Sequence, residues 1–172
     1  HIDKGLTIRG VDIGSGQPII DAGGIGNAVE ISADQVTLHG IVAMNSSNTS
    51  LKHGAGIRFS ASNYCTVSGI VSYDNYYGIN LADSHNNTIS ASNISDSQYG
   101  IRIYFSNNNT IEQNTIRKTE TPLDIVSSEG NLIQVNTLSD NSNEIKTSTE
   151  NKIINNYDLF LKDINESKDY VE

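Results

Sequence analysis

The sequence predicts an all-β fold, a parallel β-solenoid, from three observations. A short segment recurs every 22 residues, apolar and polar residues alternate within each copy, and Asn, Ser, Asp and Gly separate the apolar runs. Alternation is the spacing of a strand, and no window repeats apolar residues at the spacing of a helix. A unit this short cannot bury a core alone, so successive units are expected to stack as turns of one coil.

The repeat is clearest in the middle of the chain. Gly56, Gly78 and Gly100 each begin a Gly-Ile segment, and Pro122 begins a fourth copy in which the glycine is replaced. Each segment is expected to be a strand whose aliphatic side chains lie under those of the next turn. Gly78 and Gly100 are expected to permit a corner conformation that a side chain would oppose.

The N-terminal units are longer but still legible. Segments 6–11, 36–41 and 65–70 are versions of one strand, spaced by 30 and 29 residues. The extra residues are expected to leave the coil as loops at 14–26 and 46–55. Loops on one side of a solenoid are where binding sites are commonly built.

Columns of Asn and Ser recur at the same spacing and are interpreted as structural. An Asn at a bend can bond to the Asn and the backbone of the next turn, which satisfies polar groups that the bend buries. Cys65 is expected to be a small buried plug in one such column. Ser148 follows Ser128 by only 20 residues, so two residues are expected to be missing between Ile133 and Ile145. The columns are Cys65, Asn87, Asn109, Asn131, Asn151; Asn114, Asn136, Asn156; and Ser62, Ser84, Ser106, Ser128, Ser148.

The regular pattern predicts a β-helix domain over 1–156. Residues 157–172 depart from it, and Phe160 with its apolar neighbours is expected to cap the last open turn before an acidic tail. No run approaches the ~20 apolar residues of a membrane span. The net charge of -9, with 11 Lys and Arg, argues against a nucleic-acid surface.

The sequence contains several Asn-x-Ser/Thr triplets (sequons), the acceptor sites for N-glycosylation. They suit a glycosylated protein that is extracellular or on the cell surface. An Asn- and Ser-rich repeat also generates such triplets by chance. The candidate glycosylation sites are Asn45, Asn48, Asn86, Asn93, Asn108 and Asn165.

The segment Lys4-Gly-Leu-Thr-Ile-Arg-Gly10, then 18–21 and 36–38, then repeated Gly-Ile-x-Leu-x-x-Ser-x-Asn-Asn-Thr-Ile units, resembles the NosD-like family. The resemblance implies a right-handed single-stranded parallel β-helix from Lys4 to about Asn156. Repeats of this kind also occur in carbohydrate-binding and sugar-hydrolase modules. The acidic, Asn- and Ser-rich composition looks most like an archaeal surface protein, and the start at His1 suggests a fragment.

The resemblance also raises copper chemistry, because the founding members are periplasmic proteins associated with copper-site maturation in nitrous oxide reductase. The candidate ligands fall in different columns without short spacing, so no metal and no cofactor are expected. These are His39, His53, His85, Met44 and Cys65.

Related β-helix enzymes place charged side chains on the outer face of one sheet, and the repeat predicts such columns here. One column is Arg58, Asn80, Arg102, Asp124 and Glu144. It is interpreted as a surface ladder in which Arg102 and Asp124 pair, or as a grip for an acidic or neutral sugar.

A second column places Tyr73-Asp74 above Ser95-Asp96, followed by Arg117-Lys118 and Ser139-Asp140. If the protein is an enzyme, four residues from the two columns are the candidate catalytic groups: Arg102, Asp124, Asp74 and Asp96.

Tyrosines favour binding more than the charges favour catalysis. Five of them fall within two adjacent turns, and an exposed tyrosine offers a flat apolar face with a hydrogen-bonding tip that suits a sugar ring. Tyr77 and Tyr99 share a column and are expected to stack. The candidate ligand-binding residues are Tyr73, Tyr76, Tyr99, Tyr104, Arg58 and Asn80.

The leading functional hypothesis is therefore a non-catalytic extracellular module, structural or adhesive, whose partners are polysaccharides or cell-surface proteins. The first alternative is a lyase, epimerase or hydrolase of acidic polysaccharides. The second is a copper-site maturation factor.

Overall fold

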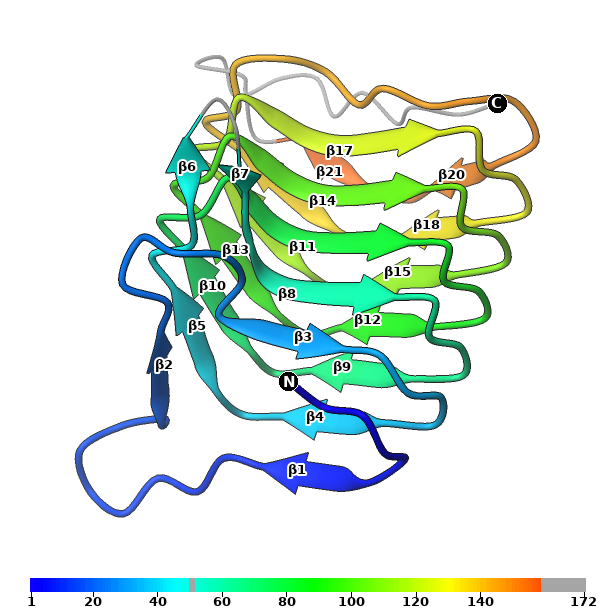
Figure 1. Cartoon of the computed structure of the whole chain (residues 1–172). Coiled ribbons are helices and arrows are strands. Elements are labelled where there is room, and N and C mark those ends of the chain that lie inside the picture. Colours follow the sequence, from blue (N-terminus) through cyan, green and yellow to red (C-terminus); the bar gives the residue numbers. More distant parts are fainter. Residues whose placement is uncertain (50–51, 159–172) are drawn as a thin grey trace.

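The computed structural model describes residues 1–49 and 52–158, which form a coil of stacked strands (Figure 1). Each strand of the coil pairs in parallel with the equivalent strand of the next turn. Through the middle of the chain the partners are 22 residues apart, as for Ile79 and Ile101 or Ile89 and Ile111. The prediction of a right-handed parallel β-helix is confirmed.

The coil has three sheets, one for each side of a turn. Sheet 1 contains β1 (Thr7–Arg9), β4 (Thr37–His39), β9 (Thr66–Ser68), β12 (Thr88–Ser90), β15 (Thr110–Glu112), β18 (Leu132–Gln134) and β20 (Lys152–Ile154). Sheet 2 contains β2 (Ile19–Asp21), β5 (Val42–Met44), β10 (Val71–Tyr73), β13 (Asn93–Ser95), β16 (Thr115–Arg117), β19 (Thr137–Ser139) and β21 (Tyr157–Asp158). Sheet 3 contains β3 (Val29–Ile31), β8 (Ala55–Ser60), β11 (Tyr77–Ala82), β14 (Tyr99–Tyr104) and β17 (Thr121–Val126).

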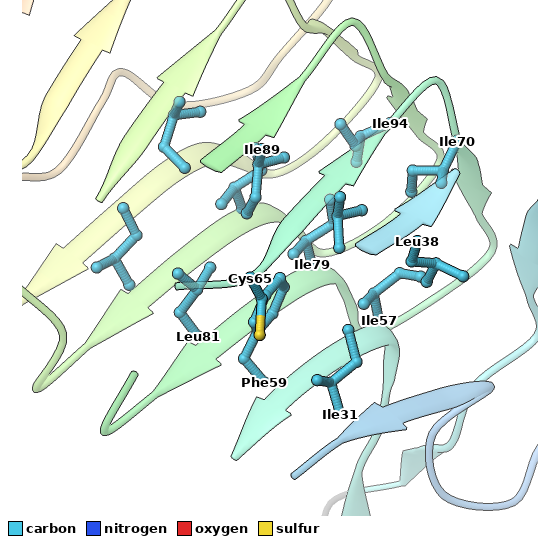
Figure 2. Close-up of a cluster of buried hydrophobic side chains, with 14 of the residues drawn as sticks. Ile31, Leu38, Ile57, Phe59, Cys65, Ile70, Ile79, Leu81, Ile89 and Ile94 are labelled. Carbon is cyan, nitrogen blue, oxygen red and sulfur yellow. The ribbon is translucent and has the colours of Figure 1, made fainter. Parts of the chain in front are cut away.

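The core is a narrow stack of aliphatic side chains inside the coil. Ile79 and Leu81 lie between Ile57 and Phe59 of the turn before and the equivalent isoleucines of the turn after, and all of them are fully buried. Figure 2 shows side chains of sheet 3 packed with Leu38 and Ile89 of sheet 1 and Ile94 of sheet 2, with Cys65 among them. Each turn thus supplies the apolar cover that its neighbour lacks.

The Asn columns run as hydrogen-bonded ladders along the coil, as predicted. Asn109 Oδ1 accepts the backbone N–H and the side-chain amide of Asn87, at 2.9 and 3.1 Å. Asn109 in turn donates its amide to Ser84 O and to Asn131 Oδ1, at 3.1 and 3.0 Å. Because these side chains are buried, the ladder satisfies backbone groups at the corner that water cannot reach.

The glycines at the start of the sheet 3 strands have a different reason from the one predicted. Gly56, Gly78 and Gly100 are not among the positive-φ residues. Instead a Cβ on Gly100 would lie 2.5 Å from Ile116 Cγ2 and would also collide with the backbone of Pro122. The constraint is therefore close packing against the core and the next turn.

Two predictions from the sequence are wrong: the place of the two missing residues, and the loop at 14–26. Asp124 is bridged to Lys146 at the usual 22-residue offset, whereas Ser128 is bonded to Ser148 at an offset of 20. The two missing residues thus lie between Lys146 and Ser148, after the strand position, so Lys146 and not Glu144 continues the charged column. The loop predicted at 14–26 contains a strand of the coil, β2, which pairs with β5.

The second insertion does leave the coil. It forms an antiparallel hairpin of β6 (Asn48–Thr49) and β7 (Lys52–His53), closed by a hydrogen bond from Gly54 N to Ser47 O. In Figure 1 the hairpin stands at the end of sheet 3 where the strands begin.

The predicted cap around Phe160 lies outside the described residues. The described part of the chain contains no helix long and apolar enough to cross a membrane.

Candidate functional site

The outer face of sheet 3 carries the predicted charged column. Register places Arg58 beside Asn80, Asn80 beside Arg102, and Arg102 beside Asp124. The column begins one strand earlier than predicted, because Glu30 of β3 pairs with Arg58. Since neighbouring strands are ~4.8 Å apart, adjacent members of the column are close enough to interact.

Arg102 is held from several sides. Its Nε lies 3.3 Å from Asp124 Oδ2, and its Nη1 donates a hydrogen bond of 2.7 Å to the Tyr77 hydroxyl. The guanidinium carbon lies 5.3 Å from the ring centroid of Tyr77 and 4.8 Å from that of Tyr104. The Nε contact lacks the alignment of a hydrogen bond, so Asp124 acts on Arg102 mainly through charge. Aromatic rings and a carboxylate together fix the position of this cation.

Three tyrosines form a contiguous cluster at the start of β11 and β14. The Tyr76 ring lies edge-on to Tyr77 at 4.6 Å, and Tyr99 lies 5.6 Å from Tyr76 and 5.4 Å from Tyr77. His53 of the hairpin stacks flat on Tyr76, with centroids 3.8 Å apart. Tyr77 and Tyr99 do lie side by side as predicted, but their rings are tilted by 38° rather than stacked. The hairpin completes one side of the cluster.

These tyrosines are held as neutral phenols. Burial raises the pKa of Tyr76, Tyr77 and Tyr99 above the usual range, more than the nearby Arg102 lowers it. The carboxylate of Asp124 raises the pKa of Tyr77 and Tyr99 further. At neutral pH their hydroxyls can therefore donate and accept hydrogen bonds, but they carry no charge.

Asn80 lies under this face and Tyr104 extends it. The Asn80 side chain is buried, and its Oδ1 has no hydrogen-bond partner, which is unusual for a buried polar atom. Tyr104, at the end of β14, meets the exposed ring of Phe105 edge-on at 4.4 Å. Arg58 is half-buried beside Asn80.

The remaining site candidates lie elsewhere. Tyr73 belongs to sheet 2, and its hydroxyl contacts Met44 Sδ at 2.9 Å. Asp74 and Asp96 follow β10 and β13 as exposed corner residues with positive φ. The four candidate catalytic residues therefore divide into the Arg102–Asp124 pair on sheet 3 and two carboxylates at a corner of the coil.

The sequons also divide. Asn86, Asn93 and Asn108 are exposed, whereas Asn45 donates its amide to Asp21 Oδ1 at 2.9 Å. Asn165 and the side chain of Asn48 lie outside the described part of the chain. Glycosylation of any of these residues stays a prediction.

Sequence reasoning considered His53 only as a copper ligand and missed its contact with Tyr76, because the hairpin that carries it has no counterpart in the other turns. The insertion itself was the available signal, since it was expected to build a site. Phe105 was also missed, because it occupies a corner position that Asp83 and Ser127 fill in the neighbouring turns.

Comparisons with known proteins agree with the parallel β-helix fold. The family model described as "Periplasmic copper-binding protein (NosD)" matches residues 2–167. Among solved structures, an alginate lyase from Paenibacillus sp. str. FPU-7 is similar, with a TM-score of 0.70 and 18% identity over 91% of this chain and 63% of the lyase chain. The chain thus spans less than two thirds of that lyase, and the likeness concerns the fold. No curated protein matches the chain.

Three of the candidate copper ligands in the described part of the coil have other partners or are buried. His85 Nδ1 accepts the backbone N–H of Asn107, Met44 Sδ accepts from Tyr73, and Cys65 is buried with a pKa raised by that burial. Within the described residues, no three His, Cys, Asp or Glu side chains gather as a metal would require.

The family model matches nearly the whole length of the chain, and the chain therefore belongs to the NosD family.

Proposed function

We propose that the chain is a non-catalytic extracellular module that binds a glycan on the outer face of sheet 3. The observation that carries the proposal is the group of His53, Tyr76, Tyr77, Tyr99, Arg102 and Tyr104, called here the tyrosine face. Aromatic planes suit the apolar faces of sugar rings, and neutral hydroxyls suit their hydroxyl groups.

The same geometry favours binding over catalysis. A general base must accept a proton near neutral pH, but the raised pKa values of Tyr76, Tyr77 and Tyr99 keep them protonated. Asp74 and Asp96 lie at a corner of the coil rather than on the tyrosine face. A rigid sheet that places several rings in fixed positions loses little conformational entropy when a ligand binds.

The test is retention of the purified protein on insoluble polysaccharides, with dissociation constants measured for soluble fragments of the glycan that is retained. Tyr99→Ala removes a ring that contacts both Tyr76 and Tyr77 and is expected to weaken binding at least about tenfold, the effect of losing roughly 1.4 kcal/mol.

Tyr64→Ala is the matched control, because Tyr64 is 64% exposed and belongs to none of the aromatic contacts. It is expected to bind like the wild type. Equal weakening in both variants, or retention of neither the wild type nor the variants, would contradict the proposal.

A polysaccharide lyase is the second candidate. The Arg102 guanidinium favours it, because a cation beside the carboxylate of a uronate would stabilise the charge that develops when the neighbouring proton is abstracted. The similar alginate lyase lends this candidate its substrate class. Release of unsaturated products from alginate or polygalacturonate, abolished by Arg102→Ala, would establish the lyase and overturn the non-catalytic proposal.

Cell-surface proteins are the alternative partners, and the family's periplasmic description is consistent with a location outside the cytoplasm. Copper-site maturation is the third candidate. It requires tight binding, so a titration with Cu(I) and Cu(II) that gives one bound ion per chain would support it. Weak, substoichiometric binding would remove it.

A further inference from the structure

The arginine of the tyrosine face is already paired with a carboxylate. Arg102 is paired with Asp124, whose side chain is only 13% exposed. Arg58, the other arginine of the column, has Glu30 as its neighbour in the adjacent strand. Each arginine therefore has a carboxylate in the adjacent strand, and of the two only Arg102 contacts it as an ion pair. The exposed Lys146, beside Asp124, is the remaining cation of the column.

Additional carboxylates surround the aromatic rings. Glu120 accepts a hydrogen bond of 2.8 Å from Gln98 Nε2, directly before Tyr99 in the chain. Besides burial, the charges of Asp124 and Glu120 raise the pKa of Tyr99. The whole chain carries a charge of -9, which repels polyanions at long range.

The aromatic groups are spread along one strand. Tyr99 stands at the start of β14 beside Tyr76 and Tyr77, and Tyr104 stands at its end beside Phe105. Five steps of ~3.3 Å separate the two ends by about 16 Å, which suits a short run of sugar residues. Arg102 lies between the ends, with its hydrogen-bonding edge fixed by Tyr77 and Asp124.

We propose that the tyrosine face selects an uncharged glycan, which lies along β14 between Tyr99 and Tyr104. This inference rests on the proposed function and names its ligand class. A uronate carboxylate would have to displace Asp124 from Arg102 and approach Glu120, and both steps cost free energy. A neutral sugar meets no such penalty, because it needs only ring faces and uncharged hydrogen-bonding groups.

The test compares glycans with the same backbone, one with carboxylates and one without. One pair is polygalacturonate and its methyl ester, and a second is mannan and mannan oxidised to the carboxylate at C6. In each pair the neutral member is expected to bind at least about tenfold more tightly. The dissociation constant of the neutral glycan is expected to change less than about twofold between roughly 0.05 and 0.5 M NaCl, because this glycan forms no ion pair with the protein.

Asp124→Asn releases Arg102 from its ion pair. The variant is expected to bind the carboxylated glycans more tightly than the wild type does, so its preference for the neutral glycans becomes smaller. Asp96→Asn makes the same change in net charge at a corner of the coil, and is expected to leave the preference unchanged. Equal narrowing in both variants would mean that net charge, rather than the local pair, sets the selectivity, which would overturn the inference.

The outcomes also separate the two proposals. Tighter binding of the carboxylated members by the wild type overturns the uncharged ligand and leaves glycan binding intact. Retention of no glycan in either pair, nor in the wider panel, overturns the proposed function and this inference with it.

Discussion

Removing one rung of the buried Asn ladder is expected to destabilise the coil strongly. Asn109→Ala deletes four side-chain hydrogen bonds, two accepted by Oδ1 and two donated by Nδ2. It removes the acceptor of the Asn87 backbone N–H and the donor to the Ser84 carbonyl, both at a corner closed to water. A buried polar group left without a partner costs about 1 to 3 kcal/mol, so two such groups lower the free energy of unfolding by roughly 2 to 6 kcal/mol.

Urea unfolding followed by circular dichroism measures this loss as a lower midpoint. Asn93→Ala is the matched control, because Asn93 is an exposed residue of β13, and its change is expected to stay within about 0.5 kcal/mol. Asn131→Ala is expected to resemble Asn109→Ala, since it occupies the same position one turn later. A loss below about 1 kcal/mol at Asn109 would refute the interpretation that the ladder stabilises the corner.

Three further predictions concern stability. Gly100→Ala is expected to cost about 1 to 3 kcal/mol in a urea midpoint, because its Cβ would meet Ile116; Ala91→Gly, at an exposed corner with φ of 48°, should cost little or nothing. Cys65→Asn is expected to preserve or raise the thermal midpoint, since an Asn there would extend the ladder from Asn87, and a clear drop would argue that the site is too small. The raised pKa values of the clustered tyrosines mean that the unfolded chain loses those protons first, so stability should hold below about pH 10 and fall as the pH rises beyond it. A urea midpoint that rises through this alkaline range would contradict that sign.

The coil and its columns could be predicted because every structural role repeats. Asn87 and Asn109 stand 22 residues apart in the chain and hydrogen-bond to each other in space. The same regularity predicted the pairing of Arg102 with Asp124, because parallel register places equal positions side by side. A pattern that recurs in each turn therefore determines the fold and the outer columns together.

The errors arise where the repeat is broken. Ser148 shows that two residues are missing, but a spacing alone does not say on which side of Lys146 they are absent, and so Glu144 was misplaced. The hairpin that brings His53 onto Tyr76 has no copy in other turns, so no column could predict the contact. Tyr73 was grouped with the other tyrosines by proximity in sequence, although a corner of the coil turns it into sheet 2.

The most direct test of glycan binding on the tyrosine face is isothermal titration calorimetry. Soluble fragments of the polysaccharide that retains the protein are titrated into the wild type, Tyr99→Ala and Tyr64→Ala. Saturable binding to the wild type and Tyr64→Ala, weakened at least about tenfold in Tyr99→Ala, is the predicted result. Identical affinities for all three proteins would contradict it, because the glycan would then bind elsewhere on the coil.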